Sequence, residues 1–223
     1  MARRLRRPVQ LELPRHAGWG GCRKGAGRRP RGEKALVAHT QRPALATRFP
    51  VHVTLRVLPH VWNLRSKRGY RVVRRALAGG GDRFGMRLCE FSIQGNHLHF
   101  VVEAEDARAL SRGMQGLSIR IAKGLNRMMA RAGKVLADRF HARILRTPTE
   151  VRRVLAYVRG NHDVHRVRRG ASASNAPDVF SSAIAAVRHV LPAPHTYLLA
   201  RARSTLDGPE DAPPTLASSR SAD

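Results

Sequence analysis

Alternation of apolar and polar residues predicts strands in the middle of the chain. From Val51 to Val57 every second residue is apolar, a period of two that is typical of a strand with one buried face. Two further apolar segments, 86–94 and 97–103, are separated by the tight-turn signal Gly95-Asn96. We therefore expect these two segments to form a β-hairpin. A short fourth strand is predicted over residues 142–145.

Apolar residues at steps of three or four predict helices between these strands. The strongest such pattern runs from Leu110 to Met128, and Gly133 follows it as a stop signal. Weaker patterns cover 64–78 and 150–161, the second preceded by Thr147-Pro148, a capping residue and an early proline. The order βαββαβ plus a helix predicts a ferredoxin-like α+β fold, an antiparallel sheet with two helices on one face.

The charge of the chain points to nucleic acid as its first partner. Lys and Arg number 42 against 15 Asp and Glu, which gives a formal net charge of +27. Such a field concentrates polyanions, and phosphate neutralisation supplies most of non-specific nucleic-acid affinity. The alternative explanation is an arginine-rich composition from a GC-rich genome. Apolar residues make up 42% of the chain, an ordinary value that allows a hydrophobic core.

The two ends differ from the middle in composition. Residues 1–48 contain 13 Lys or Arg and 2 Asp or Glu in a Gly- and Pro-rich setting, which predicts a disordered basic arm. A purely solvated tail is the alternative. Residues 49–168 form the predicted core domain, and 169–223 form an Ala-, Ser- and Pro-rich tail, mostly disordered, with room for a short helix within 176–203. Candidate DNA contacts in the basic arm are Lys24, Arg28 and Arg29.

Neither the N-terminus nor the cysteines suggest export. The basic start is followed by Leu-Glu-Leu-Pro rather than an apolar run, so we expect no signal peptide, and no apolar stretch is long enough for a membrane span. Cys22 and Cys89 lie too far apart in sequence for a zinc motif or a disulfide framework. These features favour a reducing, cytoplasmic location without a membrane partner.

A histidine pair is the first candidate for chemistry. His97 and His99 are separated by one residue on a predicted strand, so both imidazoles face the same side, opposite to Leu98 and Phe100. This is the sheet face that the two predicted core helices leave uncovered. Two neighbouring imidazoles can bind one divalent ion. Taken alone, a pair of ordinary surface or core histidines is the more common explanation.

The last predicted helix carries a tyrosine outside its apolar stripe. The apolar residues from Val151 to Val158 share one side, and Tyr157 lies roughly 110° from the centre of that stripe. Asn161 follows one turn later, at a neighbouring position of the helix surface. A phenol and a carboxamide therefore project together. The alternative is an exposed tyrosine near a helix end.

Together these side chains match the needs of phosphodiester cleavage, which requires a positioned nucleophile and a cation on the phosphate oxygens. Two imidazoles and one amide oxygen leave coordination positions open, an arrangement that suits Mg²⁺ or Mn²⁺ rather than a structural zinc ion. A nearby cation and arginines favour the phenolate form of the tyrosine. The resulting phosphotyrosine ester would keep the bond energy, so a 3′-hydroxyl could reverse the step.

The residues around these positions resemble the IS200/IS605-like single-tyrosine transposases, in particular the branch related to repetitive-element-associated tyrosine transposases. Gln94–Glu103 (QGNHLHFVVE) is similar to the His-hydrophobic-His strand of that family, and Ala156–Asn161 (AYVRGN) to its nucleophile helix. Pro50–Arg56 (PVHVTLR) resembles its first strand, and Ala137–His141 (ADRFH) the start of its last strand. The matches follow the family order over about residues 48–165.

This resemblance implies a homodimer that acts on hairpin-bearing single-stranded DNA through a 5′-phosphotyrosine intermediate and a divalent metal. It also implies a bacterial, nucleoid-associated protein. Tyr157 matches the nucleophile. The matching metal ligands are His97, His99 and Asn161. The family commonly places Pro after this asparagine, where this chain has His162, so His162 and His165 stay open as alternative third ligands.

Arg56 and Arg139, which lie within the matched segments, are further candidate DNA contacts. Two other functions stay open. A non-catalytic or domesticated nucleic-acid-binding regulator would keep the fold, but aromatic residues are only 5% of the chain, which argues against recognition by base stacking on the sheet. Replication-initiator and relaxase nucleases share the histidine motif, yet they are usually longer and carry additional domains.

Overall fold

The computed structural model describes residues 43–208, except for 168–169, 171, 173–175 and 189–190. The described residues all belong to one unit of the chain, Val37–Asp223. Most of the predicted basic arm, including Lys24, Arg28 and Arg29, lies outside them, as do residues 209–223. Among the described helices, none is long and apolar enough to cross a bilayer.

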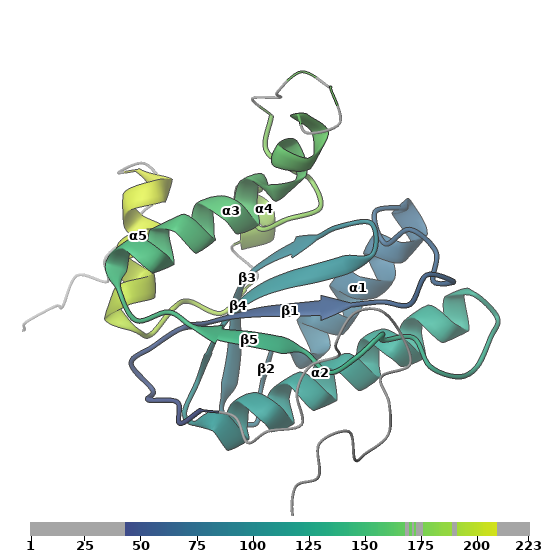
Figure 1. Ribbon diagram of the computed structural model, residues 1–223, viewed down its shortest axis with the longest axis horizontal. Helices are drawn as coiled ribbons and strands as arrows, with labels where there is room; N and C mark the ends of the chain where they lie inside the picture. Colours follow the sequence, from purple (N-terminus) through teal and green to yellow (C-terminus); the bar gives the residue numbers. More distant parts are fainter. Residues whose placement is uncertain (1–42, 168–169, 171, 173–175, 189–190, 209–223) are drawn as a thin grey trace, which may run out of the picture. The chain divides into compact units, whose positions relative to one another are not determined.

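Five strands form one sheet in the order β2-β3-β4-β1-β5, and each recorded pair of neighbours is antiparallel (Figure 1). The strands are β1 (Val51–Arg56), β2 (Asp82–Arg83), β3 (Met86–Ile93), β4 (His97–Ala104) and β5 (His141–Ile144). The first strand therefore lies between the hairpin strand β4 and the last strand, as the βαββαβ order requires. The predicted ferredoxin-like α+β fold is confirmed.

Two helices, α1 (Lys67–Gly80) and α2 (Ala107–Met128), cover one face of this sheet. Each begins at a residue whose side chain accepts a hydrogen bond from a backbone amide, Ser66 for α1 and Asp106 for α2. The core between helices and sheet contains every second residue of β1, as the alternation predicts. Gly113 lets α2 approach the sheet, because a Cβ there would lie 2.5 Å from Cβ of Met86.

The opposite face carries α3 (Pro148–Val167), which packs on β3 and β4 over a second, smaller core. Its start matches the prediction: Pro148 is its first residue, and the hydroxyl of Thr147 accepts a hydrogen bond from the amide of Glu150. The Glu150 carboxylate accepts hydrogen bonds from the amides of Arg146 and Thr147, and the bond from Arg146 is the main reason why its pKa is lowered. The helix extends beyond the predicted end at Asn161.

Residues after α3 that the sequence pattern assigns to a low-complexity tail contain two helices, α4 (Ala185–Arg188) and α5 (Tyr197–Asp207). Helix α5 packs against α3. Its start is fixed by the buried carboxylate of Glu103 on β4, which accepts hydrogen bonds from the amides of His195 and Thr196 and from the Thr196 hydroxyl. The sequence pattern allows one short helix in this region, over 176–203, whereas the structure has two, and α5 continues beyond residue 203.

Candidate functional site

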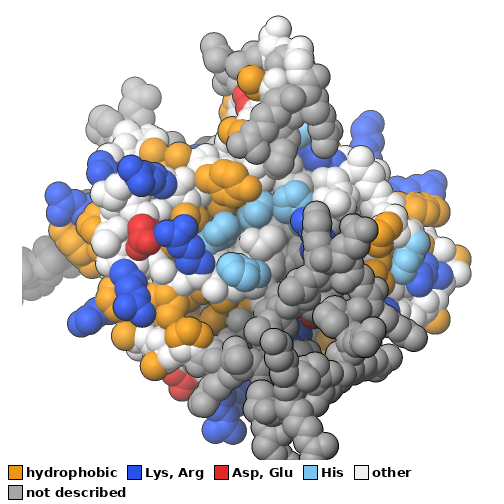
Figure 2. All heavy atoms as spheres, viewed as in Figure 1, with side chains coloured by type: hydrophobic (Ala, Val, Ile, Leu, Met, Phe, Trp, Pro, Cys, Tyr) orange, Lys and Arg blue, Asp and Glu red, His pale blue; other side chains and the backbone are white. Residues whose placement is uncertain are grey.

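Strand β4 places the two predicted histidines on the sheet face away from α1 and α2. Leu98 and Phe100 belong to the core beneath those helices, so the alternating side chains of His97 and His99 point the other way. Their ring centroids are 4.8 Å apart, and His99 is only 5% exposed. Figure 2 shows several histidine side chains gathered in one patch of this face, with Lys and Arg side chains close by.

Helix α3 brings the predicted nucleophile to this pair. The hydroxyl oxygen of Tyr157 lies 3.5 Å from Nε2 of His99, and the two rings meet edge to face with centroids 5.2 Å apart. Tyr157 remains 39% exposed. All of these side chains belong to one chain, and the phenol meets the imidazoles without a partner subunit.

Strand β1 supplies two further residues that the sequence analysis did not select. Nε2 of His52 lies 3.2 Å from Nδ1 of His99, and Oγ1 of Thr54 lies 3.3 Å from the same nitrogen. The pKa of His52 is lowered to about 4, mainly by burial and then by the charges of His141 and Arg143. His52 is therefore neutral at physiological pH, and its nitrogen atoms are available for hydrogen bonding to the pair.

The hydrogen bond to His97 fixes which nitrogen of that ring carries the proton. Nδ1 of His97 lies 2.8 Å from the side-chain oxygen of Asn96. An amide oxygen only accepts, so Nδ1 is the protonated nitrogen of this pair, and in the neutral ring Nε2 keeps its lone pair. That is the form in which an imidazole binds a metal through Nε2.

Asn161 is buried, and neither its side-chain oxygen nor its side-chain nitrogen has a hydrogen-bond partner within the described residues. Burying a carboxamide without hydrogen-bond partners costs free energy. Such an unsatisfied group is expected where the side chain binds an ion or ligand. The described residues contain no cluster of three His, Cys, Asp or Glu that could hold a metal. Asn161, the third of the predicted ligands, offers a carboxamide oxygen, a donor type that Mg²⁺ and Mn²⁺ accept.

The other candidates for a third ligand are less informative. His162 is partly exposed, and its pKa is lowered, mainly by partial burial and then by the charge of Arg65. The side chain of His165 lies outside the part of the chain that is described.

Two of the predicted DNA contacts can be located. Arg56 is exposed at the end of β1, directly opposite His97 in the strand register, and so borders the histidine patch. Arg139 is exposed in the segment before β5, where its amide donates a hydrogen bond to Asp138. It lines a groove of about 680 Å³ between this segment and α2, on the other side of the sheet from the histidines.

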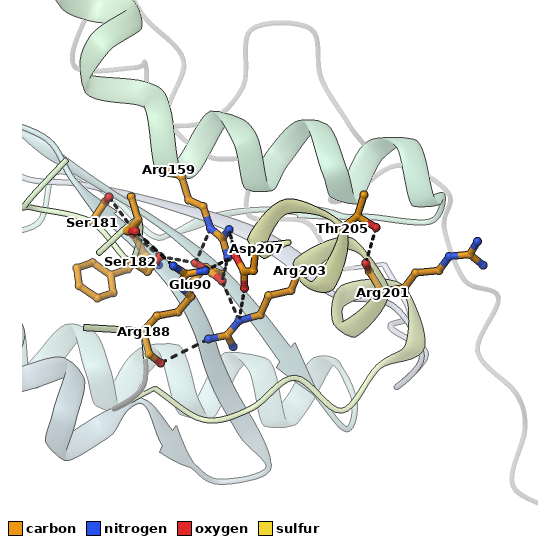
Figure 3. A network of polar contacts seen from close by, with 11 residues as sticks. Glu90, Arg159, Ser181, Ser182, Arg188, Arg201, Arg203, Thr205 and Asp207 are labelled. Atoms are coloured by element: carbon orange, nitrogen blue, oxygen red, sulfur yellow. Dashed lines mark hydrogen bonds and ion pairs between the residues drawn. The ribbon is translucent and has the colours of Figure 1, made fainter. Parts of the chain in front are cut away.

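Figure 3 shows a network of polar contacts that joins Arg159 of α3 to residues of β3 and α5. Arg159, two residues after Tyr157, pairs with Glu90 of β3 at 2.7 Å and with Asp207 of α5 at 2.5 Å. Ser182, Arg188 and Arg203 also bind to Glu90 or Asp207 in this network. Most of these partners lie beyond residue 178, so residues outside the predicted core domain anchor the helix that carries Tyr157.

Comparison with known proteins supports the fold. No protein-family model and no curated protein matches the sequence. Among solved structures, the chain is similar to a REP-associated tyrosine transposase bound to a REP hairpin, with a TM-score of 0.50 and 14% sequence identity. The similarity covers 70% of this chain and 88% of that one. At this identity the likeness shows a shared fold.

Proposed function

We propose that this chain is a metal-dependent tyrosine transposase, a single-stranded DNA endonuclease and strand-transferase that forms a 5′-phosphotyrosine intermediate. The observation that carries the proposal is the 3.5 Å separation between the Tyr157 hydroxyl and Nε2 of His99, beside His97 on the same strand. A nucleophile and two metal-binding side chains thus meet on a face that substrate can reach. The fold shared with a solved tyrosine transposase supports the same reading.

In the proposed reaction Tyr157 releases its phenolic proton to solvent, and its oxygen attacks a backbone phosphorus atom. The bond between phosphorus and the 3′-oxygen of the leaving strand breaks, that oxygen takes up a proton, and the 5′-phosphate stays on the tyrosine. In the rejoining step a 3′-hydroxyl attacks the same phosphorus, and the tyrosine oxygen leaves. One phosphodiester is exchanged for another in each cycle, so no ATP is needed.

The residues that would hold the metal are His97 and His99 through Nε2, with the Asn161 carboxamide as the third ligand. Mg²⁺ or Mn²⁺ would neutralise negative charge on the phosphate oxygens and favour the phenolate form of Tyr157. Two nitrogen donors and one oxygen donor leave positions for substrate oxygens and water. The buried, unpartnered Asn161 side chain supports its assignment over His162.

The proposed substrate is a single-stranded DNA that carries a hairpin. The net charge of +27 favours a polyanion, and the structurally similar transposase is bound to a REP hairpin. Arg56, exposed beside His97, is a suitable phosphate contact at the edge of the site. We also propose a homodimer, although Tyr157 and both histidines come together within one chain.

Covalent capture tests the proposal directly. Oligonucleotides with imperfect palindromes from the DNA flanking the gene, labelled at the 3′ end, are incubated with protein and Mn²⁺ or Mg²⁺ and separated on denaturing gels. We expect a labelled protein band that EDTA abolishes. Tyr157→Phe should lose the band and still bind DNA, and His97→Ala or His99→Ala should lose it as well.

Tyr197→Phe is the matched control, because Tyr197 is an exposed tyrosine on α5 whose hydroxyl accepts a hydrogen bond from Arg201. This variant should form the adduct at the wild-type level. An adduct that persists in Tyr157→Phe would show that another residue is the nucleophile. DNA binding without any adduct in the wild type would favour the non-catalytic regulator of the same fold.

A further inference from the structure

The imidazole of His99 is contacted on both of its nitrogen atoms. Nε2 faces the Tyr157 hydroxyl at 3.5 Å, and Nδ1 faces Nε2 of His52 at 3.2 Å and Oγ1 of Thr54 at 3.3 Å. A neutral imidazole carries one proton, so only one of its nitrogens can donate while the other accepts. The direction of the hydrogen bond to His52 therefore decides what His99 presents to Tyr157.

Two arrangements exclude each other. In the first, Nδ1–H of His99 donates to Nε2 of His52, with the Thr54 oxygen as a second acceptor, and Nε2 of His99 keeps a lone pair on the side of Tyr157. In the second, Nε2–H of His52 donates to Nδ1 of His99. The proton of His99 then lies on Nε2 and points at the phenol, which blocks that nitrogen for a metal.

We propose that His52 is a positioning residue that holds His99 in its Nδ1–H form, so that Nε2 is kept for a divalent metal beside Tyr157. Hydrogen bonds of this kind commonly set the tautomer and orientation of metal-binding histidines. The first arrangement uses Thr54 as an additional acceptor, and it gives His99 the same form that the Asn96 oxygen imposes on His97.

The placement of His52 suits this role because the strand pairing fixes it. Thr54 of β1 lies directly opposite His99 of β4, and His52 precedes it by two residues on the same face. The rings of His52 and His99 stack with centroids 5.3 Å apart and an angle of 25° between their planes. The two histidines that share this hydrogen bond thus lie on adjacent strands rather than on loops.

Nitrogen NMR tests the tautomer without metal or DNA. Long-range ¹H–¹⁵N spectra of full-length protein with labelled histidines, near pH 8, distinguish a protonated from an unprotonated ring nitrogen. We expect His99 to carry its proton on Nδ1 in the wild type and to show mixed tautomers in His52→Ala. His52→Gln should restore the Nδ1–H form, since the glutamine oxygen can accept the same hydrogen bond.

Manganese binding, followed by calorimetry without DNA, gives a second measurement. We expect His52→Ala to weaken Mn²⁺ binding by about 10-fold to 100-fold, and His52→Gln to recover most of that loss. His60→Gln is the matched control, because His60 lies outside this face and contacts the carbonyl oxygen of Lys134. Thermal unfolding of each variant checks that the fold is kept.

The inference rests on the proposed function for the role of the metal. The experiments distinguish a failure of the inference from a failure of the proposed function. A wild-type His99 with its proton on Nε2, or unchanged tautomer and Mn²⁺ affinity in His52→Ala, would overturn the role of His52 whatever the adduct assay shows. Wild-type protein that binds no Mn²⁺ would overturn the metal part of the inference. A missing adduct with an Nδ1–H His99 and tight Mn²⁺ binding would leave the inference in place and remove the transposase proposal.

Discussion

At the scale of single residues, Cys89 shows how strongly this sheet controls the chemistry of a side chain. It is fully buried on β3 in the small core beneath α3. Burial raises the pKa of its thiol, and the carboxylates of Glu103 and Glu90 raise it further because a thiolate would be repelled. The reactive thiolate form is therefore scarce even in mildly alkaline solution.

This predicts an inert thiol in the folded protein. In a Cys22→Ser variant, which leaves Cys89 as the only cysteine, a disulfide-exchange reagent at pH 8 should release about one equivalent of chromophore only after denaturation. Raising the pH to 9 should change little in the native state, because the raised pKa keeps the thiol protonated. Rapid labelling of native protein at pH 8 would contradict the buried position of Cys89.

At the scale of elements, α3 is held by buried ion pairs as well as by its apolar stripe. Arg159 links this helix to β3 through Glu90 and to α5 through Asp207. Asp207 also pairs with Arg188. The side chains concerned are at most 13% exposed, so water cannot replace a lost partner easily.

Asp207→Asn should therefore lower the free energy of unfolding by about 3 kcal/mol, since it leaves Arg159 and Arg188 short of a buried partner. Denaturant titration measures the change. Asp163→Asn is the matched control on α3, where the partly exposed pair with Arg166 at 3.8 Å should contribute less than about 1 kcal/mol. Equal effects of the two variants would show that the buried network does not hold the helix.

Elements whose signals are local could be predicted from the sequence. Of the contacts between distant elements, that of Tyr157 with the histidine pair was expected from the grouped motifs, whereas others were not. The alternation in β1, the long periodicity of α2 and the spacings His97-x-His99 and Tyr157-x-x-x-Asn161 are all visible within a few residues. The contact between His52 and His99 spans 47 positions and depends on the register of β1 with β4. The hydrogen bond between Ser182 and Glu90 spans 92 positions, so the sequence around either residue does not predict it.

At the scale of the whole molecule, the charge predicts how binding responds to salt. With a formal net charge of +27, association with a hairpin oligonucleotide should be driven largely by release of counterions. If about six phosphates are neutralised, affinity should fall roughly 10³-fold between 50 and 200 mM salt. Fluorescence anisotropy over this range measures the slope, and a Kd that barely changes with salt would argue against an electrostatic interface.

The interaction of Glu103 with the start of α5 bears on how the protein can be shortened. A recombinant fragment that stopped at residue 168, the predicted end of the core domain, would lack the backbone amides of His195 and Thr196 and would leave the Glu103 carboxylate without these donors. Glu90 would likewise lose Ser182 and Arg203. The smallest piece expected to keep its fold thus reaches at least Asp207, well beyond the last residue proposed to touch DNA or metal.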